Sequence, residues 1–438
     1  MQNKLILATL LAAACSGDDN HAVQPDAGQA DAAADALVVP QSKCDGTPTD
    51  LRTDLTWFGN NRQTLTTWLD SKGCKSAGFD KTHRPVALWD WDNTISKNDF
   101  GDAITYWFIS HGKVLQPAGQ DWHNSSAYLS DAAVTALATA CGTTVAAGAP
   151  FPAPTATNHD CADEMLSIYD NETTRAGAAA WKQGNERRLE PAFAWTPQLM
   201  AGYTHAEVQA ETQAMMAVEL AAPLDTTQTI GTTAGENGWL RIYDQQKDLI
   251  GAAQSRGYDV WIITASPQDV IQTAAQMVGI PADHVIGIRS KTDAAGKLTT
   301  AFEGCGDVPD GGDIIPYVQG KRCYVNKVIW GDTGAAAFQR RPDGDRQVFA
   351  AGDSDSDVEF LRDATYKLAI NRNKADLMCH AYYSERSTWV VNPMFIEPKA
   401  AKAAPYACST AFVDEAGAAG ATRDEAGNRI PDQTDSVH

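Results

Sequence analysis

The chain of 438 residues is 43% hydrophobic, which is enough for a substantial core in one large domain with an insertion or in two domains. Its formal charge of −20 at pH 7 argues against binding to nucleic acid and against adsorption to anionic lipid. Because the local charge at a small site can differ from this total, a small-molecule substrate remains open.

The first 15 residues have the pattern of a processing signal rather than of a folded element. A short cationic start precedes an apolar run, Leu5 to Ala14, that is too short to span a bilayer. The following run to Cys15 resembles a bacterial lipoprotein cleavage box and predicts a lipid on Cys15; an ordinary secretory signal cleaved nearby is the alternative. We therefore expect an exported bacterial protein, held at the cell envelope only by a lipid anchor at Cys15, or else periplasmic or secreted.

Two further segments and the cysteines complete this picture. Residues 16–43 are rich in Asp, Ala, Gly and Pro and predict a flexible tether, and residues 413–438 predict a disordered acidic tail. Apart from Cys15 there are eight cysteines, and an even number in an exported chain indicates disulfides. Their spacing favours pairing between neighbours in the sequence: Cys44 with Cys74, Cys141 with Cys161, Cys305 with Cys323, and Cys379 with Cys408.

The first predicted strand, Val86 to Trp89, is followed at once by Asp90 and, two residues later, by Asp92. Side chains two apart in a strand share a face, so the two carboxylates lie close together. Their repulsion is relieved when a cation binds between them or when one keeps its proton. The five residues from Asp90 to Thr94, taken alone, fit a solvated turn and a catalytic pair about equally well.

Residues 96–238 predict a helical insertion, a cap, between two parts of a core formed by residues 44–95 and 239–412. Asp99 to Ser110 has apolar residues at helical spacing, and Thr204 with Glu207 forms a capping box that opens a helix to about Leu220. The insertion is rich in aromatic residues. Most of these are expected to pack in the core of the cap, although an aromatic cage for a quaternary ammonium group is the alternative. They are Tyr106, Trp107, Trp122, Tyr128, Tyr169, Trp181 and Trp195.

Beyond the insertion, strands and helices alternate. An amphipathic helix is predicted from Trp239 to Arg256, and a strand follows from Tyr258 that leads into a helix with Ser266 as its N-cap. Further strands are predicted at His284–Ile288, Gln347–Ala351 and Tyr366–Ile370. This order predicts an α/β fold with a doubly wound parallel sheet.

The ends of these strands carry polar side chains. The first strand delivers Asp90 and Asp92, the second delivers Thr264, and the fourth delivers Asp353 and Asp357. In a parallel sheet these ends lie at one edge and form one crevice. A lysine near a helix start, Lys327 or Lys321, falls between the second and the fourth. Carboxylates, a hydroxyl and an ammonium group suit Mg²⁺ together with phosphate.

This ordered set resembles the four motifs of the haloacid-dehalogenase-like hydrolase superfamily, over roughly residues 84–412. The resemblance implies a phosphoric monoester hydrolase of small phosphate esters. Asp90 would be the nucleophile that forms an aspartyl-phosphate, and Asp92 the general acid and then base. Thr264 and Lys327 would bind the phosphoryl group, with Lys321 as the alternative lysine. The Mg²⁺ ligands would be Asp90, Asp92 through its backbone carbonyl, Asp353 and Asp357.

Exported proteins with these motifs and a large helical insertion are similar to phosphorylcholine phosphatases. We therefore expect a Mg²⁺-dependent phosphomonoesterase, with phosphorylcholine as one candidate substrate and Trp91 as a candidate contact to it. A broad phosphatase that scavenges phosphate and a lipoprotein that only binds a ligand are the alternatives. The presence of both Asp90 and Asp92 argues against the last.

Overall fold

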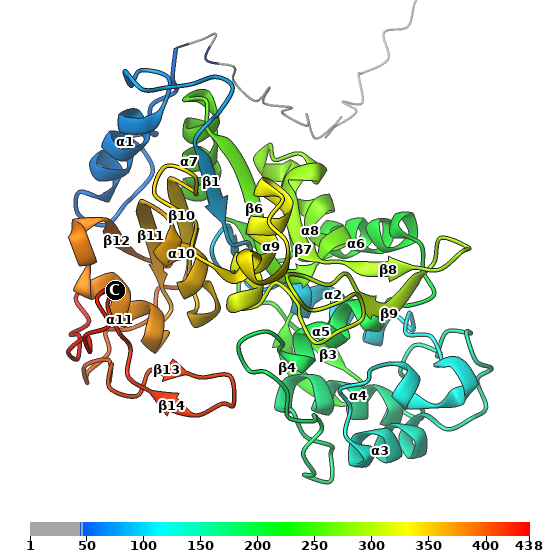
Figure 1. Cartoon of the computed structure of the whole chain (residues 1–438). Helices are drawn as coiled ribbons and strands as arrows, with labels where there is room; N and C mark the ends of the chain where they lie inside the picture. Colours follow the sequence, from blue (N-terminus) through cyan, green and yellow to red (C-terminus); the bar gives the residue numbers. More distant parts are fainter. Residues whose placement is uncertain (1–43, 45–46) are drawn as a thin grey trace, which may run out of the picture. The chain divides into compact units, whose positions relative to one another are not determined.

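A six-stranded parallel sheet forms the centre of the fold. The computed structural model describes Cys44 and residues 47–438. The strand order is β12-β11-β10-β1-β6-β7, and all neighbouring pairs run parallel (Figure 1). The strands are β1 (Val86–Trp89), β6 (Asp259–Pro267), β7 (Val285–Ile288), β10 (Phe349–Gly352), β11 (Tyr366–Asn371) and β12 (Trp389–Pro393). The prediction of an α/β fold with a parallel sheet is confirmed, and β12 is an additional strand.

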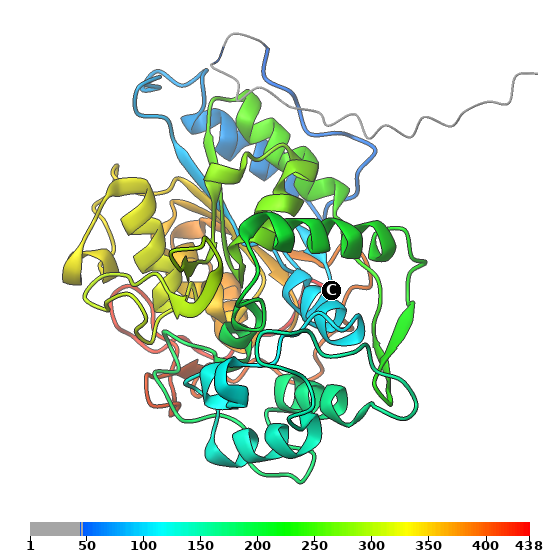
Figure 2. The same cartoon turned by 90° about the vertical axis from the view of Figure 1, so that its right-hand side faces the viewer.

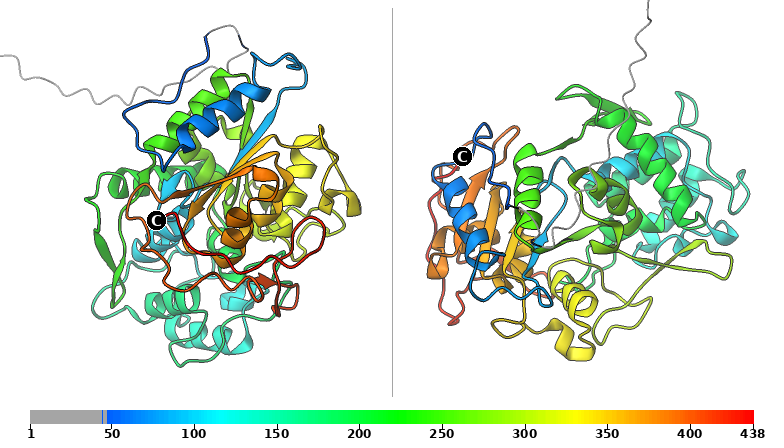
Figure 3. Two further views of the ribbon diagram at one scale, coloured as in Figure 1. Left: turned by 90° about the vertical axis from the view of Figure 1, so that its left-hand side faces the viewer. Right: turned by 90° about the horizontal axis from the view of Figure 1, so that it is seen from above.

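Helices cover both faces of this sheet because both faces are apolar. In β1 the side chains of Ala87 and Trp89 join one hydrophobic cluster, whereas Val86 and Leu88 join another on the opposite face. The first cluster contains residues of α1 (Asn61–Lys72), α7 (Asp244–Ser255) and α8 (Gln268–Ala275). The second contains residues of α9 (Gln319–Trp330), α10 (Val358–Asp363) and α11 (Ala375–Tyr383). The left view in Figure 3 shows these layers, with α1 in blue and α11 in orange on opposite sides of the strands.

The segment between the first two sheet strands is largely helical. It leaves through β2 (Ser96–Lys97) and returns through β5 (Arg241–Ile242), and these two short strands pair antiparallel. Figure 2 faces this segment and shows α3 and α4, in cyan, at the end remote from α1. Its elements are α2 (Phe100–Ser110), α3 (Asp131–Cys141), α4 (Asp160–Asn171), α5 (Pro191–Gln198), α6 (His205–Glu219) and the hairpin of β3 (Thr227–Ile230) and β4 (Thr233–Asn237).

Some helix boundaries in and near this segment agree with the sequence-based predictions, and others differ. The capping box is confirmed, since Thr204 Oγ1 accepts from the Glu207 amide and Glu207 accepts from the Thr204 amide. The helix predicted from Trp239 begins only at Asp244, because the residues before it pair with β2. A second hairpin, β8 (Ser290–Thr292) with β9 (Leu298–Phe302), follows β7. Short 3₁₀ turns lie at Ala118–Gln120, Trp122–Asn124, Gln276–Val278, Ala282–His284, Gly334–Phe338, Asp355–Asp357 and Glu385–Ser387.

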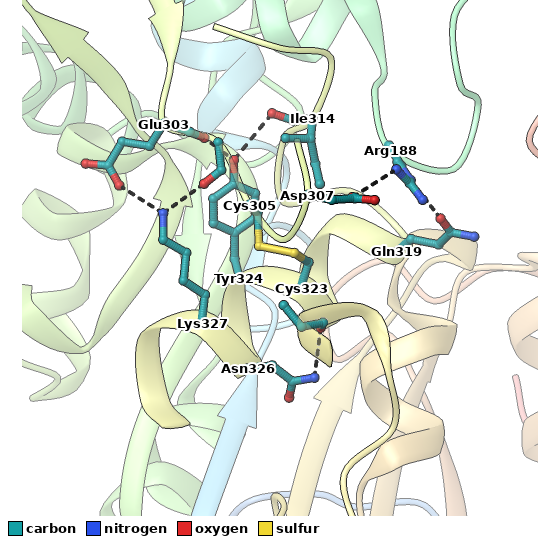
Figure 4. The surroundings of a disulfide bond; sticks show 12 residues. Arg188, Glu303, Cys305, Asp307, Ile314, Gln319, Cys323, Tyr324, Asn326 and Lys327 are labelled. Carbon is teal, nitrogen blue, oxygen red and sulfur yellow. Dashed lines mark hydrogen bonds and ion pairs between the residues drawn. A yellow bond between two sulfur atoms is a disulfide. The ribbon is translucent and has the colours of Figure 1, made fainter. Parts of the chain in front are cut away.

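Four disulfides connect the cysteines in the predicted way. They join Cys44 to Cys74, Cys141 to Cys161, Cys305 to Cys323, and Cys379 to Cys408. Figure 4 shows the third, which ties the loop after β9 to α9. Among the residues that the structure describes, no helix combines the length and the apolar character that a membrane span requires.

The prediction of a disordered tail for residues 413–438 is wrong. Two short strands, β13 (Phe412–Val413) and β14 (Ala419–Gly420), pair there, and Val437 is buried. The side-chain Nδ2 of Asn371 donates to Asp435 Oδ1 at 3.1 Å and to the Val437 carbonyl at 2.7 Å. Hydrogen bonds to core side chains thus fix a segment whose composition is polar. The predicted signal, the lipidation site at Cys15 and the tether lie outside the described residues.

Candidate active site

The carboxyl ends of three neighbouring strands meet at one cavity. Asp90 follows β1, which lies between β10 and β6, and Asp353 follows β10. Both line a cavity of about 360 Å³, together with Asp92 and with Thr264 of β6. Asp357 lies behind this wall, with its side chain fully buried. The structure therefore brings together the predicted residues from all three strand ends.

The lysine at this site is Lys321, and the preference for Lys327 is wrong. Lys321 Nζ lies 2.6 Å from Asp90 Oδ1 and 2.5 Å from Asp357 Oδ1, with all three side chains buried. Lys327 Nζ instead donates to the Gly304 carbonyl at 2.8 Å and points toward Glu303, as Figure 4 shows. Six residues of α-helix turn through about 600°, so the two side chains leave α9 roughly 120° apart.

The carboxylates around Lys321 oppose the effect of burial on its pKa. Burial alone lowers the pKa of Lys321, but the carboxylates of Asp357 and Asp90 outweigh it and raise that pKa. Burial, followed by the charge of Asp357, raises the pKa of Asp90 well above its usual range despite the ammonium group. The cluster thus holds more negative charge than Lys321 alone offsets.

Asp92 is held by hydrogen bonds on both carboxylate oxygens. Oδ1 accepts from the Phe100 amide at 2.7 Å, and Oδ2 accepts from Ser266 Oγ at 2.6 Å. Burial and the nearby charge of Asp99 raise the pKa of Asp92, whereas the Ser266 hydrogen bond opposes the rise. A raised pKa suits a group that must donate a proton. Asp92 is therefore a fixed, cavity-lining carboxyl group that is biased toward its protonated form.

Ser266 differs from its predicted role. It remains in β6, which continues through Pro267, and α8 begins at Gln268 without a side-chain cap. Its hydroxyl faces the cavity wall and orients Asp92 instead. The serine–proline pattern that predicted an N-cap also fits the end of a long strand.

A group of carboxylates here has the chemistry of a site for a hard cation. Asp90, Asp353 and Asp357 each offer an oxygen within 4.8 Å of the others, and all three residues are buried. Thr94 Oγ1 donates to Asp353 Oδ1 at 2.7 Å and to Asp90 Oδ2 at 3.2 Å. Oxygen ligands at this spacing fit Mg²⁺, and a divalent cation would relieve the repulsion that, after burial, contributes to the raised Asp90 pKa.

Several charged residues of the wall were missed by the sequence analysis, among them Arg372, Lys374, Asp99 and Asp102. Arg372, directly after β11, places Nη1 2.5 Å from Asp353 Oδ2. Asp99 caps α2 by accepting from the amides of Gly101 and Asp102. Asp102 accepts from Tyr169 Oη at 2.8 Å, and burial followed by the charge of Asp99 raises its pKa well above the usual range. The position of Arg372 at a strand end was the one signal that could have indicated it.

The aromatic residues of the cavity wall are mostly not those that the sequence suggested. Tyr169 lines the cavity as one of the predicted set, whereas Phe193 and Tyr317 were not considered. Trp91 is fully buried against Phe100 and does not line this cavity. The tryptophans at 122 and 195 are also buried, as expected for core packing of the cap.

Comparisons with known proteins agree with this arrangement. Residues 163–362 match the family described as HAD, haloacid dehalogenase-like hydrolase, a span that contains Thr264, Lys321 and Asp353. The chain is thus similar to that family over these residues. The comparison with curated proteins gave no match.

Several solved structures resemble this chain at low sequence identity. A conserved functionally unknown protein from Anaerococcus prevotii DSM 20548 is 17% identical, with a TM-score of 0.57 over 79% of this chain and 94% of that one. A protein of unknown function from Bordetella pertussis Tohama I is 16% identical, with a TM-score of 0.41 over 70% and 97%. A substrate-bound phosphoserine phosphatase is 13% identical, with a TM-score of 0.30 over 66% and 86%. The first of these likenesses shows a common fold.

Proposed function

We propose that this chain is a haloacid dehalogenase-like phosphatase that hydrolyses small phosphate monoesters through an aspartyl-phosphate on Asp90. The observation that carries the proposal is the convergence of Asp90, Asp92 and Lys321 on one cavity, next to the Asp353 carboxylate. The family match over residues 163–362 supports the same class of reaction.

In the proposed reaction Asp90 and Asp92 have different roles. A carboxylate oxygen of Asp90 attacks phosphorus, and the bond to the ester oxygen breaks as Asp92 gives that oxygen its proton. Asp92 then takes a proton from water, which attacks the acyl phosphate, releases inorganic phosphate and restores Asp90. Lys321 and Thr264 would bind phosphoryl oxygens and offset their charge, since both line the cavity beside Asp90.

The carboxylates of Asp90 and Asp353 and the backbone carbonyl of Asp92 would hold Mg²⁺. Asp357 Oδ2 already accepts from the amides of Asp353 and Ser354, at 2.9 Å each, so it would support the site. Bound Mg²⁺ would neutralise the phosphoryl group as charge builds on it.

The wall on the side of the cap suggests which ester is hydrolysed. Asp99 and Asp102 lie there with the rings of Tyr169, Phe193 and Tyr317. Aromatic faces attract a cationic ammonium group, and such a cation would favour the ionised form of Asp102, whose pKa is raised by burial and by the charge of Asp99. This wall favours an amine phosphate such as phosphorylcholine over a broad set of esters.

The proposed place of action is outside the cytoplasm. Four disulfides are typical of exported proteins, because thiols in the cytoplasm are kept reduced. A lipid at Cys15 would hold the protein at the cell envelope.

Hydrolysis of p-nitrophenyl phosphate with and without Mg²⁺ tests this function. Wild type should be active only with Mg²⁺, Asp90→Asn should be inactive, and Asp131→Asn, on an exposed side chain of the cap, should match wild type. An inactive wild type, or an Asp90→Asn variant as active as wild type, would refute the proposal.

A panel of phosphorylcholine, phosphoethanolamine and phosphoserine tests the substrate separately. A preference for phosphorylcholine that falls in Asp102→Asn supports the amine site. Equal rates on all three esters would refute the amine site and indicate a phosphatase of broad specificity.

A further inference from the structure

Arg372 forms an ion pair with a carboxylate of the proposed metal site. Its Nη1 lies 2.5 Å from Asp353 Oδ2, and the Asp353 side chain is only 1% exposed. The Arg372 side chain is 26% exposed and lines the cavity. The contact therefore joins a fixed buried anion to a cation that reaches the space where substrate would bind.

The ion pair and a bound Mg²⁺ compete for the same carboxylate. Asp353 Oδ1 accepts from Thr94, so the guanidinium occupies the other oxygen. Mg²⁺ sits about 2.0–2.1 Å from its ligand oxygens, which would place it within roughly 5 Å of the guanidinium. Two positive charges at such a short distance in a buried site repel each other strongly.

Lys321 and Arg372, which each pair with a carboxylate of the proposed metal site, differ in their freedom to move. Lys321 is held by both Asp90 and Asp357 and is 1% exposed, so it is fixed. Arg372 has the longer side chain, follows the last residue of β11 and faces the cavity. Displacement of a cation by Mg²⁺ is therefore easier at Arg372.

We propose that Arg372 is an internal counter-ion that neutralises Asp353 in the metal-free protein. Binding of a divalent cation displaces Arg372 into the cavity, where its guanidinium binds the phosphoryl group of the substrate. The inference rests on the proposed Mg²⁺ site and adds a residue to the phosphate-binding set. A guanidinium suits this role because its fork of N–H groups matches phosphate oxygens.

The proposal has a thermodynamic consequence for the free protein. The metal must break the ion pair of Arg372, and phosphate supplies the released guanidinium with a new partner. Mg²⁺ and phosphate therefore each strengthen the binding of the other through Arg372, by the same factor. Removal of Arg372 should strengthen Mg²⁺ binding and weaken this coupling.

Isothermal titration with Mg²⁺, with and without inorganic phosphate, tests this on wild type, Arg372→Gln and Lys374→Gln. Lys374 lines the same cavity, and its ammonium group has no hydrogen bond or ion pair within the described part of the chain. Lys374→Gln therefore removes an equal charge without freeing Asp353. We expect Mg²⁺ alone to bind Arg372→Gln roughly tenfold more tightly than wild type, and Lys374→Gln within about threefold.

The second measurement is phosphate affinity at saturating Mg²⁺. It should fall roughly tenfold in Arg372→Gln, the size expected for loss of a charge-assisted hydrogen bond. Mg²⁺ should also raise the melting temperature of Arg372→Gln more than that of wild type, because the variant leaves Asp353 without its partner. The phosphate affinity of Arg372→Lys, which keeps the charge but not the fork of N–H groups, should lie between that of wild type and that of Arg372→Gln.

The outcomes separate this inference from the function on which it rests. If none of the proteins binds Mg²⁺, the proposed metal site is wrong and the inference is wrong with it. If wild type binds Mg²⁺ but Arg372→Gln binds it no more tightly than Lys374→Gln does, the metal site stands and the role of Arg372 is refuted.

Discussion

Replacement of Lys321 by methionine should damage both stability and activity, whereas the same change at Lys327 should damage neither greatly. Methionine has a similar length but no charge, so it leaves Asp90 and Asp357 buried without their shared cation. Loss of one partner of a buried ion pair costs roughly 3–5 kcal/mol. The Lys327 side chain is 36% exposed, and its loss removes a hydrogen bond to a backbone carbonyl.

The size of the melting shift follows from the length of the folded part. An unfolding entropy of about 2.1 cal/mol/K per residue, summed over residues 47–438, gives about 0.8 kcal/mol/K. The loss of Lys321 should therefore lower the melting temperature by about 4–6 °C. Calorimetry at pH 8 and pH 5 measures it.

The pH dependence of this deficit has a definite sign. Without Lys321 the pKa of Asp90 rises further, because the ammonium charge lowers it in wild type. A carboxyl group whose folded pKa exceeds its unfolded pKa destabilises the fold at high pH, and the penalty is lost as pH falls toward the unfolded value. The deficit of Lys321→Met should therefore be largest at pH 8 and smaller at pH 5.

Activity gives the second readout. We expect kcat of Lys321→Met to fall by about 10²–10³-fold, the usual effect of removing one group that stabilises transition-state charge, and that of Lys327→Met by less than about threefold. A larger loss in Lys327→Met, or a melting deficit in Lys321→Met that grows toward pH 5, would refute the reasoning.

Three further predictions concern other parts of the chain. Burial raises the pKa of Glu219 to about 7. The free energy of unfolding of wild type should therefore fall as pH rises from 4.5 through 7. Urea unfolding should show Glu219→Gln to be more stable than wild type by up to about 3 kcal/mol at pH 8.5, and no more stable than wild type at pH 4.5. Serines at Cys305 and Cys323 should lower kcat about tenfold by loosening α9, and serines at Cys141 and Cys161 should not. Deletion of residues 431–438 should lower the melting temperature and leave kcat unchanged, because it removes the tail contacts to Asn371.

Much of the site could be predicted because it depends on one geometrical rule. Short apolar strands followed by Asp90, Thr264 or Asp353 can be recognised in the sequence, and a parallel sheet must bring their ends together. The disulfides could be predicted for a related reason, since short separations favour pairing of neighbouring cysteines.

The features that escaped prediction depend on details that pattern alone leaves open. The choice between Lys321 and Lys327 depends on the helical phase of α9, which begins at Gln319. Ser266 was assigned to a helix because β6 runs further than its apolar residues suggest. The order of the tail arises from polar contacts to Asn371, and a composition test cannot detect these.

The entry and exit of the cap lie side by side. Ser96 pairs with Ile242 and Lys97 with Arg241, so the chain leaves the core and returns to it at almost one point. Evolution could therefore exchange the whole inserted segment through two nearby crossovers, and the six sheet strands would keep their connections. Selectivity in such a protein can diverge by substitution of a module, while Asp90 and its partners stay under separate selection. A chimaera joined at these two pairs is the matching route for engineering.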